Sequence, residues 1–96
     1  MKISATLEKH RATVNDLVAR HNALNPRVFG SVARGDDTDQ SDLDLLADAT
    51  RSTTLFDLGE LQLALEDVLG ISVDVCTISD LPARFRASVL AEARAL

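Results

Sequence analysis

Cysteine is almost absent from this sequence, and long apolar runs are missing. The single cysteine, Cys76, cannot form an internal disulfide, and no CxxC or Cys/His spacing suggests a zinc site. No apolar run approaches the roughly 20 residues of a membrane span, and the first residues lack the apolar core of a signal peptide. We therefore expect a cytoplasmic protein in a reducing compartment, with no membrane partner.

Basic residues are also scarce. Ten Lys and Arg stand against fifteen Asp and Glu, and the net charge of −5 argues against nucleic acid as a partner held by a broad basic face. The excess of negative charge is local, because six Asp residues fall within a thirteen-residue stretch that contains no Lys or Arg. They are Asp36, Asp37, Asp39, Asp42, Asp44 and Asp48. We expect the first three to lie in a solvated loop.

The length of 96 residues suits one domain, residues 1–96, around a single core. Apolar spacing predicts helices over residues 3–24 and 53–69 and a third after Ser79-Asp80. Alternation and β-branched residues predict strands over 27–29, 42–47 and 71–78. This order predicts an α/β (α+β) fold, in which helices pack on one face of a small mixed sheet and the other face or its edge is left for a site.

Turn and cap residues set the expected ends of these elements. Asn25-Pro26 should end the first helix, because proline disfavours helix in the residue before it. Thr53 or Thr54 is suited to cap the second helix, and Gly70 to stop it. The last helix is expected to bury Phe85, Val89 and Ala93.

Alternation of Asp and Leu over residues 42–45 predicts a strand with two carboxylates on one face. Asp42 and Asp44 would project from the same side, about 7 Å apart along the backbone, whereas Leu43 and Leu45 would point to the core. Carboxylate oxygens at this spacing suit Mg²⁺, which takes one or two protein carboxylates and completes its shell with water and substrate phosphates. The alternative is the solvated face of an amphipathic strand.

Gly30 and Ser31 follow directly after a predicted strand, where the chain must turn. Glycine lets the backbone approach a phosphate closely, and Ser31 offers a hydroxyl and N–H groups at a predicted helix start, which attracts anions. Arg34 would lie about one helical turn further on and could reach the same anion. The alternative is an ordinary Gly-Ser pair between a strand and a turn.

Asp74 is the one acid of an otherwise apolar segment, between Val73 and Val75, so we expect it to face away from the core. If this strand pairs beside residues 42–47, Asp74 joins Asp42 and Asp44 as a third carboxylate. The alternative is a lone acid that protects a sheet edge from unwanted pairing.

Gly30-Ser31, ten residues and then Asp42-Leu43-Asp44 resemble the signature of the nucleotidyltransferase superfamily that includes DNA polymerase beta. The longer string Phe-Gly-Ser-Val-Ala-Arg-Gly-Asp, followed by Ser-Asp-Leu-Asp-Leu-Leu, is similar to the minimal nucleotidyltransferases of prokaryotes. With Asp74 and the final helix, the resemblance covers nearly the whole chain. It implies the nucleotidyltransferase fold.

The resemblance also implies roles for the candidate residues. In that family the Gly-Ser pair holds a nucleotide triphosphate, the DxD carboxylates bind Mg²⁺, and a third strand acid completes the site. The implied set is Gly30 and Ser31 for ATP, with Asp42, Asp44 and Asp74 as catalytic residues and ligands of two Mg²⁺ ions. Independently of the resemblance, the position of Ser31 and Arg34 after the turn suggests that they would orient the β- and γ-phosphates as pyrophosphate leaves.

Minimal members of this type resemble antitoxins that pair with HEPN-domain ribonuclease toxins. The resemblance implies transfer of AMP from ATP to a tyrosine of the toxin within a hetero-oligomer, and this sequence has no tyrosine of its own to modify. Two alternatives remain open. One is a binding module that neutralises its partner by covering it, and the other is a free-standing enzyme that modifies a small molecule such as an aminoglycoside.

Overall fold

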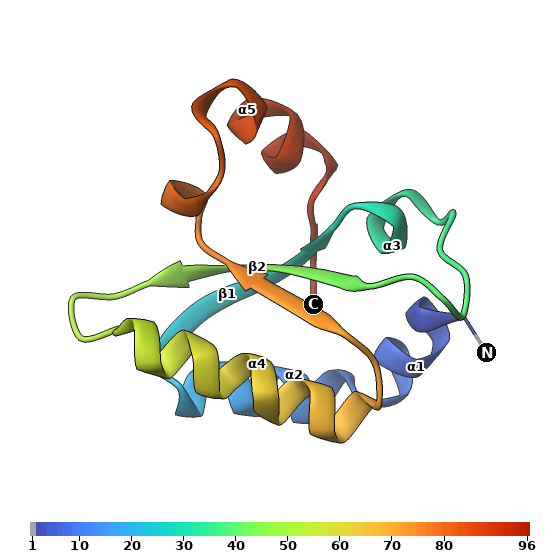
Figure 1. Cartoon of the computed structure of the whole chain (residues 1–96), viewed down its shortest axis with the longest axis horizontal. Helices are drawn as coiled ribbons and strands as arrows, with labels where there is room; N and C mark the ends of the chain where they lie inside the picture. Colours follow the sequence, from blue (N-terminus) through green and yellow to red (C-terminus); the bar gives the residue numbers. More distant parts are fainter. Residues whose placement is uncertain (1) are drawn as a thin grey trace.

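The computed structural model describes residues 2–96, which form a mixed sheet with helices above and below it (Figure 1). The elements are α1 (Ile3–Lys9), α2 (Arg11–Arg20), β1 (Ala23–Phe29), α3 (Ser31–Arg34), β2 (Leu43–Ala49), α4 (Leu55–Leu69), β3 (Val73–Cys76), the 3-10 turn η1 (Ile78–Asp80), α5 (Ala83–Glu92) and β4 (Arg94–Ala95). The strand order is β3-β2-β1-β4. Strand β2 runs parallel to β3, whereas β1 is antiparallel to both of its neighbours.

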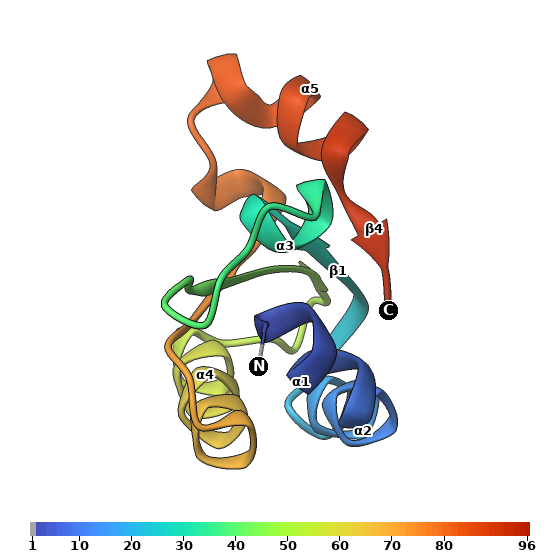
Figure 2. The ribbon, with the colours of Figure 1, turned by 90° about the vertical axis from the view of Figure 1, so that its right-hand side faces the viewer.

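Helices α2 and α4 lie beneath one face of the sheet, and α5 stands on the opposite side (Figures 1 and 2). Leu43, Leu45 and Ala47 of β2 are fully buried and join side chains of α1, α2 and α4 in one core. The predicted α/β fold with a small mixed sheet is confirmed. Helices α1, α2 and α4 pack on one face as predicted, whereas α5 lies on the other side. None of the helices that the structure describes is long and apolar enough to cross a bilayer.

Helix α4 begins and ends where its sequence predicts. The Thr54 hydroxyl accepts a hydrogen bond from the N–H of Asp57 at 3.1 Å, and the Asp57 carboxylate accepts one from the N–H of Thr54 at 2.9 Å. This reciprocal capping box makes Thr54, rather than Thr53, the N-cap. Gly70 takes a left-handed φ of 69° and ends the helix.

The helix predicted over residues 3–24 is in fact two helices followed by a strand. The backbone leaves the helical conformation at His10, and α2 ends at Arg20. Asn22 then has a φ of 59°, a left-handed conformation that asparagine adopts more readily than most residues. Apolar spacing does not reveal such single-residue breaks, so the prediction was too long.

Strand β1 begins earlier than predicted, at Ala23, because a bulge accommodates the proline. Its register on β2 slips by one residue between Leu24 and Arg27. Asn25 has a φ of 52° at this bulge, and Pro26 follows it. A proline cannot donate to the ladder, and bulges are among the few positions where strands tolerate it.

The C-terminal segment packs less closely than its sequence predicts. Helix α5 has no buried residue, and Phe85 is 47% exposed. Val89 and Ala93 are only partly buried. The prediction that these three form part of the core is therefore wrong, because α5 stands off a sheet face that carries polar side chains. The short strand β4, which was not predicted, ties the segment to β1 instead.

Strand β3 is shorter than the predicted 71–78. It ends at Cys76, because Thr77 and Asp80 form a second capping box that turns the chain into η1. The Asp80 carboxylate accepts from the Thr77 N–H at 2.9 Å.

The acidic stretch is not one solvated loop. Asp36 and Asp39 are exposed as expected, but Asp37 is only 2% exposed. Its Oδ2 accepts a hydrogen bond of 2.9 Å from the backbone N–H of Ser4, in the first turn of α1. The expectation for Asp37 was wrong, because this carboxylate satisfies a helix N–H that has no partner within the helix.

Replacing Asp37 by alanine is expected to lower the free energy of unfolding by about 2 kcal/mol, a typical effect of losing a buried hydrogen bond to a charged group. The Ser4 N–H holds the pKa of Asp37 below its usual value. The stabilisation is therefore complete above the usual Asp pKa of about 3.9 and is lost as the pH falls through the lowered pKa. Urea unfolding at neutral pH measures the loss, with the exposed Asp39→Ala as the control. Equal stability of the two variants would rule out an anchoring role.

Candidate active site

Asp44 and Asp74 lie opposite each other on neighbouring strands. The parallel register of β2 and β3 pairs Asp44 with Asp74 and Leu43 with Val73. Leu43 and Val73 are buried in the core. Side chains alternate along a strand, so the two carboxylates face the other side of the sheet, away from α2 and α4. The strand pairing expected for Asp74 is present.

Asp42 adds a third negative charge at the beginning of β2. It is exposed and precedes the strand by one residue. Partial burial raises the pKa of Asp44, and the charges of Asp74 and Asp42 raise it further. Three carboxylates therefore share a region of negative potential, which the positive charge of Arg34 partly offsets.

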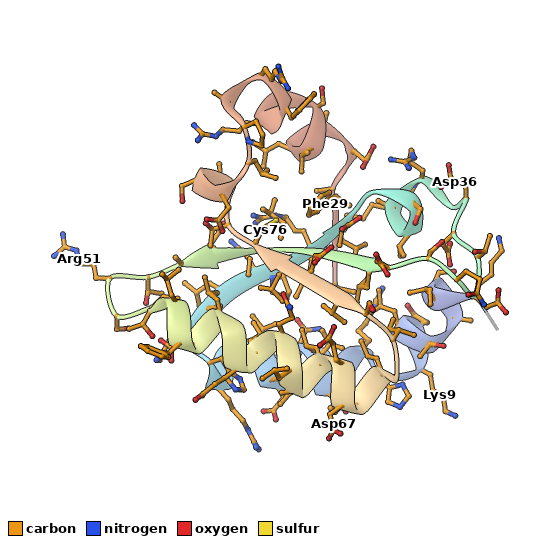
Figure 3. The ribbon with its side chains drawn as sticks, viewed as in Figure 1. Lys9, Phe29, Asp36, Arg51, Asp67 and Cys76 are labelled. Atoms are coloured by element: carbon orange, nitrogen blue, oxygen red, sulfur yellow. The ribbon has the colours of Figure 1, made fainter. Side chains whose placement is uncertain are left out.

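Gly30 brings the end of β1 against Asp44. Phe29 pairs with Asp44 across β1 and β2, and Figure 3 shows its ring on the side of the sheet opposite α4. Gly30 has φ 72° and ψ −149°, a conformation that is essentially restricted to glycine. A Cβ at this position would overlap Asp44 Oδ2 and lie 3.3 Å from its Cγ. Both the backbone conformation and the close approach therefore require glycine.

Ser31 and Arg34 are the first and last residues of the one-turn helix α3, which ends at Gly35. The Arg34 Nη1 donates to Glu92 Oε2 at 3.3 Å, and its Nε donates to Asp36 Oδ2 at 3.3 Å. These two carboxylates raise the pKa of Arg34 above its usual value, so its charge persists at any physiological pH. The structure thus brings Arg34 to the same end of the sheet as the three predicted acids.

No sequence pattern singles out Glu92, yet its carboxylate also lies at this site. Glu92 Oε1 accepts a hydrogen bond of 2.6 Å from the N–H of Gly30. Its position depends on β4, which pairs with Arg27 and Val28 of β1 and so draws the end of α5 toward the Gly30 turn. The two partners are 62 residues apart in the chain, and a contact at that separation leaves no local signal.

Residues 12–96 match a family model described as polymerase beta, nucleotidyltransferase. The chain belongs to the polymerase beta nucleotidyltransferase family. It is an enzyme of the nucleotidyltransferase class, as its Gly-Ser and Asp-Leu-Asp motifs indicate. The family that the sequence resembles is confirmed.

Two archaeal relatives of this nucleotidyltransferase have names that specify a protein substrate. The protein adenylyltransferase MntA of Thermococcus cleftensis is 33% identical over 91 residues, which cover 95% of this chain and 89% of the relative. A Methanocaldococcus jannaschii protein, provisionally named a protein adenylyltransferase, is 34% identical over 77 residues, which cover 80% of this chain and 83% of the relative.

Solved structures share the fold of this nucleotidyltransferase. A protein described provisionally as a minimal nucleotidyltransferase is 47% identical and superposes with a TM-score of 0.89 over 100% of this chain and 97% of its own. A toxin–antitoxin structure with AMP-PNP superposes with a TM-score of 0.75 over 88% of this chain and 69% of that chain. At 19% identity, the second likeness shows the fold alone.

The carboxylates of this nucleotidyltransferase fit Mg²⁺ in donor type and in charge. Asp42, Asp44 and Asp74 offer oxygen donors, which Mg²⁺ prefers. Burial raises the pKa of Asp44, and the charges of Asp74 and Asp42 raise it further. A cation would relieve the repulsion among these charges. Within residues 2–96, no three His, Cys, Asp or Glu side chains are already gathered around one ion position. The fit is therefore one of chemistry rather than of a preformed cage.

Cys76 lies close to these acids but does not suit a nucleophilic role. It is partly buried on β3, opposite Leu46 of β2, and Figure 3 shows it on the same side of the sheet as Phe29. Burial raises the pKa of its thiol to about 11. The thiol is therefore protonated at neutral pH, whereas the nucleophilic form of cysteine is the thiolate.

Proposed function

We propose that this nucleotidyltransferase transfers AMP from ATP to a tyrosine hydroxyl of a cognate HEPN-domain ribonuclease toxin, acting as its antitoxin in the cytoplasm. The observation that carries the proposal is the pairing of Asp44 with Asp74 beside the turn at Gly30. This arrangement places two acidic side chains, which can bind cations, beside the Gly30 N–H, which can bind an anion. A nucleoside triphosphate with its metal ions needs both.

Gly30, Ser31 and Arg34 would hold the triphosphate. The N–H of Gly30 already donates to a carboxylate oxygen, so it is oriented toward an anionic acceptor. Arg34 is about half exposed, at 52%, and can turn toward the β- and γ-phosphates. Together with the Ser31 hydroxyl, it would orient the pyrophosphate as it leaves.

Asp42, Asp44 and Asp74 would hold Mg²⁺, and we expect two ions. Bound Mg²⁺ would neutralise phosphate charge and favour ionisation of the acceptor hydroxyl. The contribution of the chain is to fix the carboxylates: the β2–β3 ladder holds Asp44 opposite Asp74. Asp42 lies just outside the strand and has more freedom to adjust.

The transfer step forms a bond between the acceptor oxygen and the α-phosphorus. It breaks the bond from the α-phosphorus to the oxygen that bridges to the β-phosphate, so the products are the AMP-modified acceptor, pyrophosphate and one proton. Asp74 is the candidate to orient the hydroxyl and accept its proton, because it is exposed on β3 whereas Asp44 is partly buried.

Three observations favour an acceptor on another protein. Relatives at 33% and 34% identity are named as protein adenylyltransferases. The sequence has no tyrosine, so a tyrosine acceptor must belong to a partner. Asp42 and Asp74 are both exposed, which places the acidic cluster on a surface that a folded protein can approach.

ATP labelled at the α-phosphate is expected to label the partner toxin, whereas ATP labelled at the γ-phosphate should leave it unlabelled. AMP transfer retains the α-phosphate and releases the other two. Incubation of chain, partner and Mg²⁺, followed by electrophoresis and autoradiography, measures the label. Label from the γ-phosphate alone would indicate a kinase and contradict the proposal.

The Asp42→Ala variant separates catalysis from simple binding. It should transfer no label and leave the ribonuclease activity of the partner intact. Full neutralisation by this variant, with no label transferred by the variant or by the wild type, would favour a binding module that covers its partner.

A further inference from the structure

The groups proposed to bind phosphate are already bound to an anion of the chain itself. Glu92, the last residue of α5, places Oε1 2.6 Å from the N–H of Gly30. The Arg34 Nη1 lies 3.4 Å from Oε1 and 3.3 Å from Oε2 of the same carboxylate. A single carboxylate thus contacts both a backbone donor and a guanidinium, as a phosphate would.

Helix α5 has little else to hold it in this position. None of its residues is buried, and Figure 2 shows it standing away from the sheet above α3. Phe85 and Leu90 are 47% and 45% exposed. Arg86 donates hydrogen bonds to the carbonyls of Leu81 and Ser79, which tie the helix to the turn before it. The two-residue strand β4 follows the helix and pairs with β1. Within α5, Glu92 is the residue that links the helix to the Gly30 turn and to Arg34.

The contact of Glu92 with the Gly30 turn also brings a further negative charge close to Asp42, Asp44 and Asp74. Burial raises the pKa of Asp44, and the charges of Asp74, Asp42 and, to the smallest extent, Glu92 raise it further. A triphosphate would bring its own negative charge to the same place. Glu92 and a nucleotide are therefore unfavourable neighbours and compete for the same donors.

We propose that Glu92 occupies the phosphate position in the nucleotide-free protein and that ATP binds by displacing it, which releases the end of α5. The inference rests on the proposed function, because it requires that the Gly30 turn and Arg34 bind phosphate. Glu92 then sets the affinity for nucleotide. Because ATP binds only to molecules in which the turn is open, the observed affinity equals the intrinsic affinity multiplied by the open fraction.

Nucleotide affinity of the Glu92→Ala variant tests this directly. The probe is an ATP analogue with a methylene bridge between the α- and β-phosphates, titrated with Mg²⁺ in a calorimeter. We expect the variant to bind about 5- to 10-fold more tightly than the wild type, as for a turn that is closed in roughly 80–90% of molecules. Alanine favours helix, so α5 should persist.

Asp36→Ala is the matched control for charge. It removes a carboxylate that also contacts Arg34, at 3.3 Å, but that makes no contact with Gly30. Loss of an exposed ion pair should change the affinity by no more than about twofold. Equal tightening in both variants would mean that the effect is general electrostatics and would overturn the inference.

Amide hydrogen exchange in α5 gives a second readout. The analogue should speed exchange over residues 83–92 in the wild type, because displaced Glu92 no longer holds the helix. In Glu92→Ala, exchange should be fast with or without the analogue. If the analogue binds but the affinity of Glu92→Ala is unchanged or weaker, Glu92 is not a competitor and only this inference fails. If neither protein binds the analogue, the proposed function fails as well.

Discussion

The Asp44→Asn variant is expected to lose AMP transfer by about 10³-fold or more, while its nucleotide-free form unfolds at a higher temperature than the wild type. A lost carboxylate ligand weakens charge stabilisation in the transition state by several kcal/mol. Each loss of about 1.4 kcal/mol lowers the rate tenfold. The rate of transfer to the partner measures the first effect and a thermal melt the second.

The gain in stability follows from the position of Asp44 among other acids. Its pKa is raised by burial and by the charges of Asp74 and Asp42. The stability it contributes is thus complete below the usual Asp pKa of about 3.9 and lost as the pH rises through the raised pKa. At neutral pH the wild type carries this repulsion and the variant does not, so a rise on the order of a few degrees is expected. The difference should vanish in acid.

Asp48→Asn is the matched control on the same strand. Asp48 lies four residues further along β2 and forms an ion pair with Arg27, with 2.8 Å between Nη2 and Oδ1. This pair holds the pKa of Asp48 below its usual value, with Asn25 contributing. The ion pair therefore stabilises the protein at neutral pH and is lost in acid. At neutral pH, Asp48→Asn should be less stable than the wild type but still active. Equal loss of transfer in both variants would contradict a specific role for Asp44.

Gly30→Ala is expected to lower AMP transfer by about 10²-fold or more and to lower the free energy of unfolding by about 2 kcal/mol. The backbone at φ 72° and ψ −149° excludes a side chain. The new Cβ would also overlap Asp44 Oδ2, so either the carboxylate or the turn must move. A displacement of about 1 Å at a reacting centre is sufficient for a 10²-fold loss.

Gly35→Ala separates backbone strain from damage to the site. Gly35 also has a positive φ, 79°, but a Cβ there meets nothing within 4 Å. The variant should lose about 1 kcal/mol of stability, the usual penalty for alanine in a left-handed conformation, and keep its transfer rate. If Gly30→Ala retained full activity at a temperature where it is folded, close approach of the turn to Asp44 would not matter for catalysis.

Local sequence rules predicted the parts of the fold that depend on neighbouring residues. The alternation of Asp and Leu placed Leu43 in the core and Asp44 on the other face. The choice of Thr53 or Thr54 as N-cap located the start of α4 to within one residue. The break at His10 and the left-handed Asn22 were missed because several residue types can adopt such conformations and tertiary packing selects among them. The prediction that Phe85 is buried was wrong, because apolar spacing shows which face of a helix is apolar but not whether another element covers that face.

The candidate site divides in the same way. Two short motifs can be recognised in the sequence: Gly30-Ser31 at a turn, and Asp42 with Asp44 at the start of a strand. The place of Asp74 followed only if β3 paired with β2, which the parallel register shows. Glu92 and the buried Asp37 were missed, because each has its partner more than thirty residues away.

Tandem mass spectrometry of the partner toxin, isolated after co-expression with this chain, tests the central claim most directly. With the wild type, and with Asp48→Asn, we expect a tyrosine of the partner to carry AMP through a phosphodiester bond. With Asp44→Asn, the same tyrosine should be unmodified. A partner that is neutralised by the wild type but carries no AMP on any residue would contradict the account.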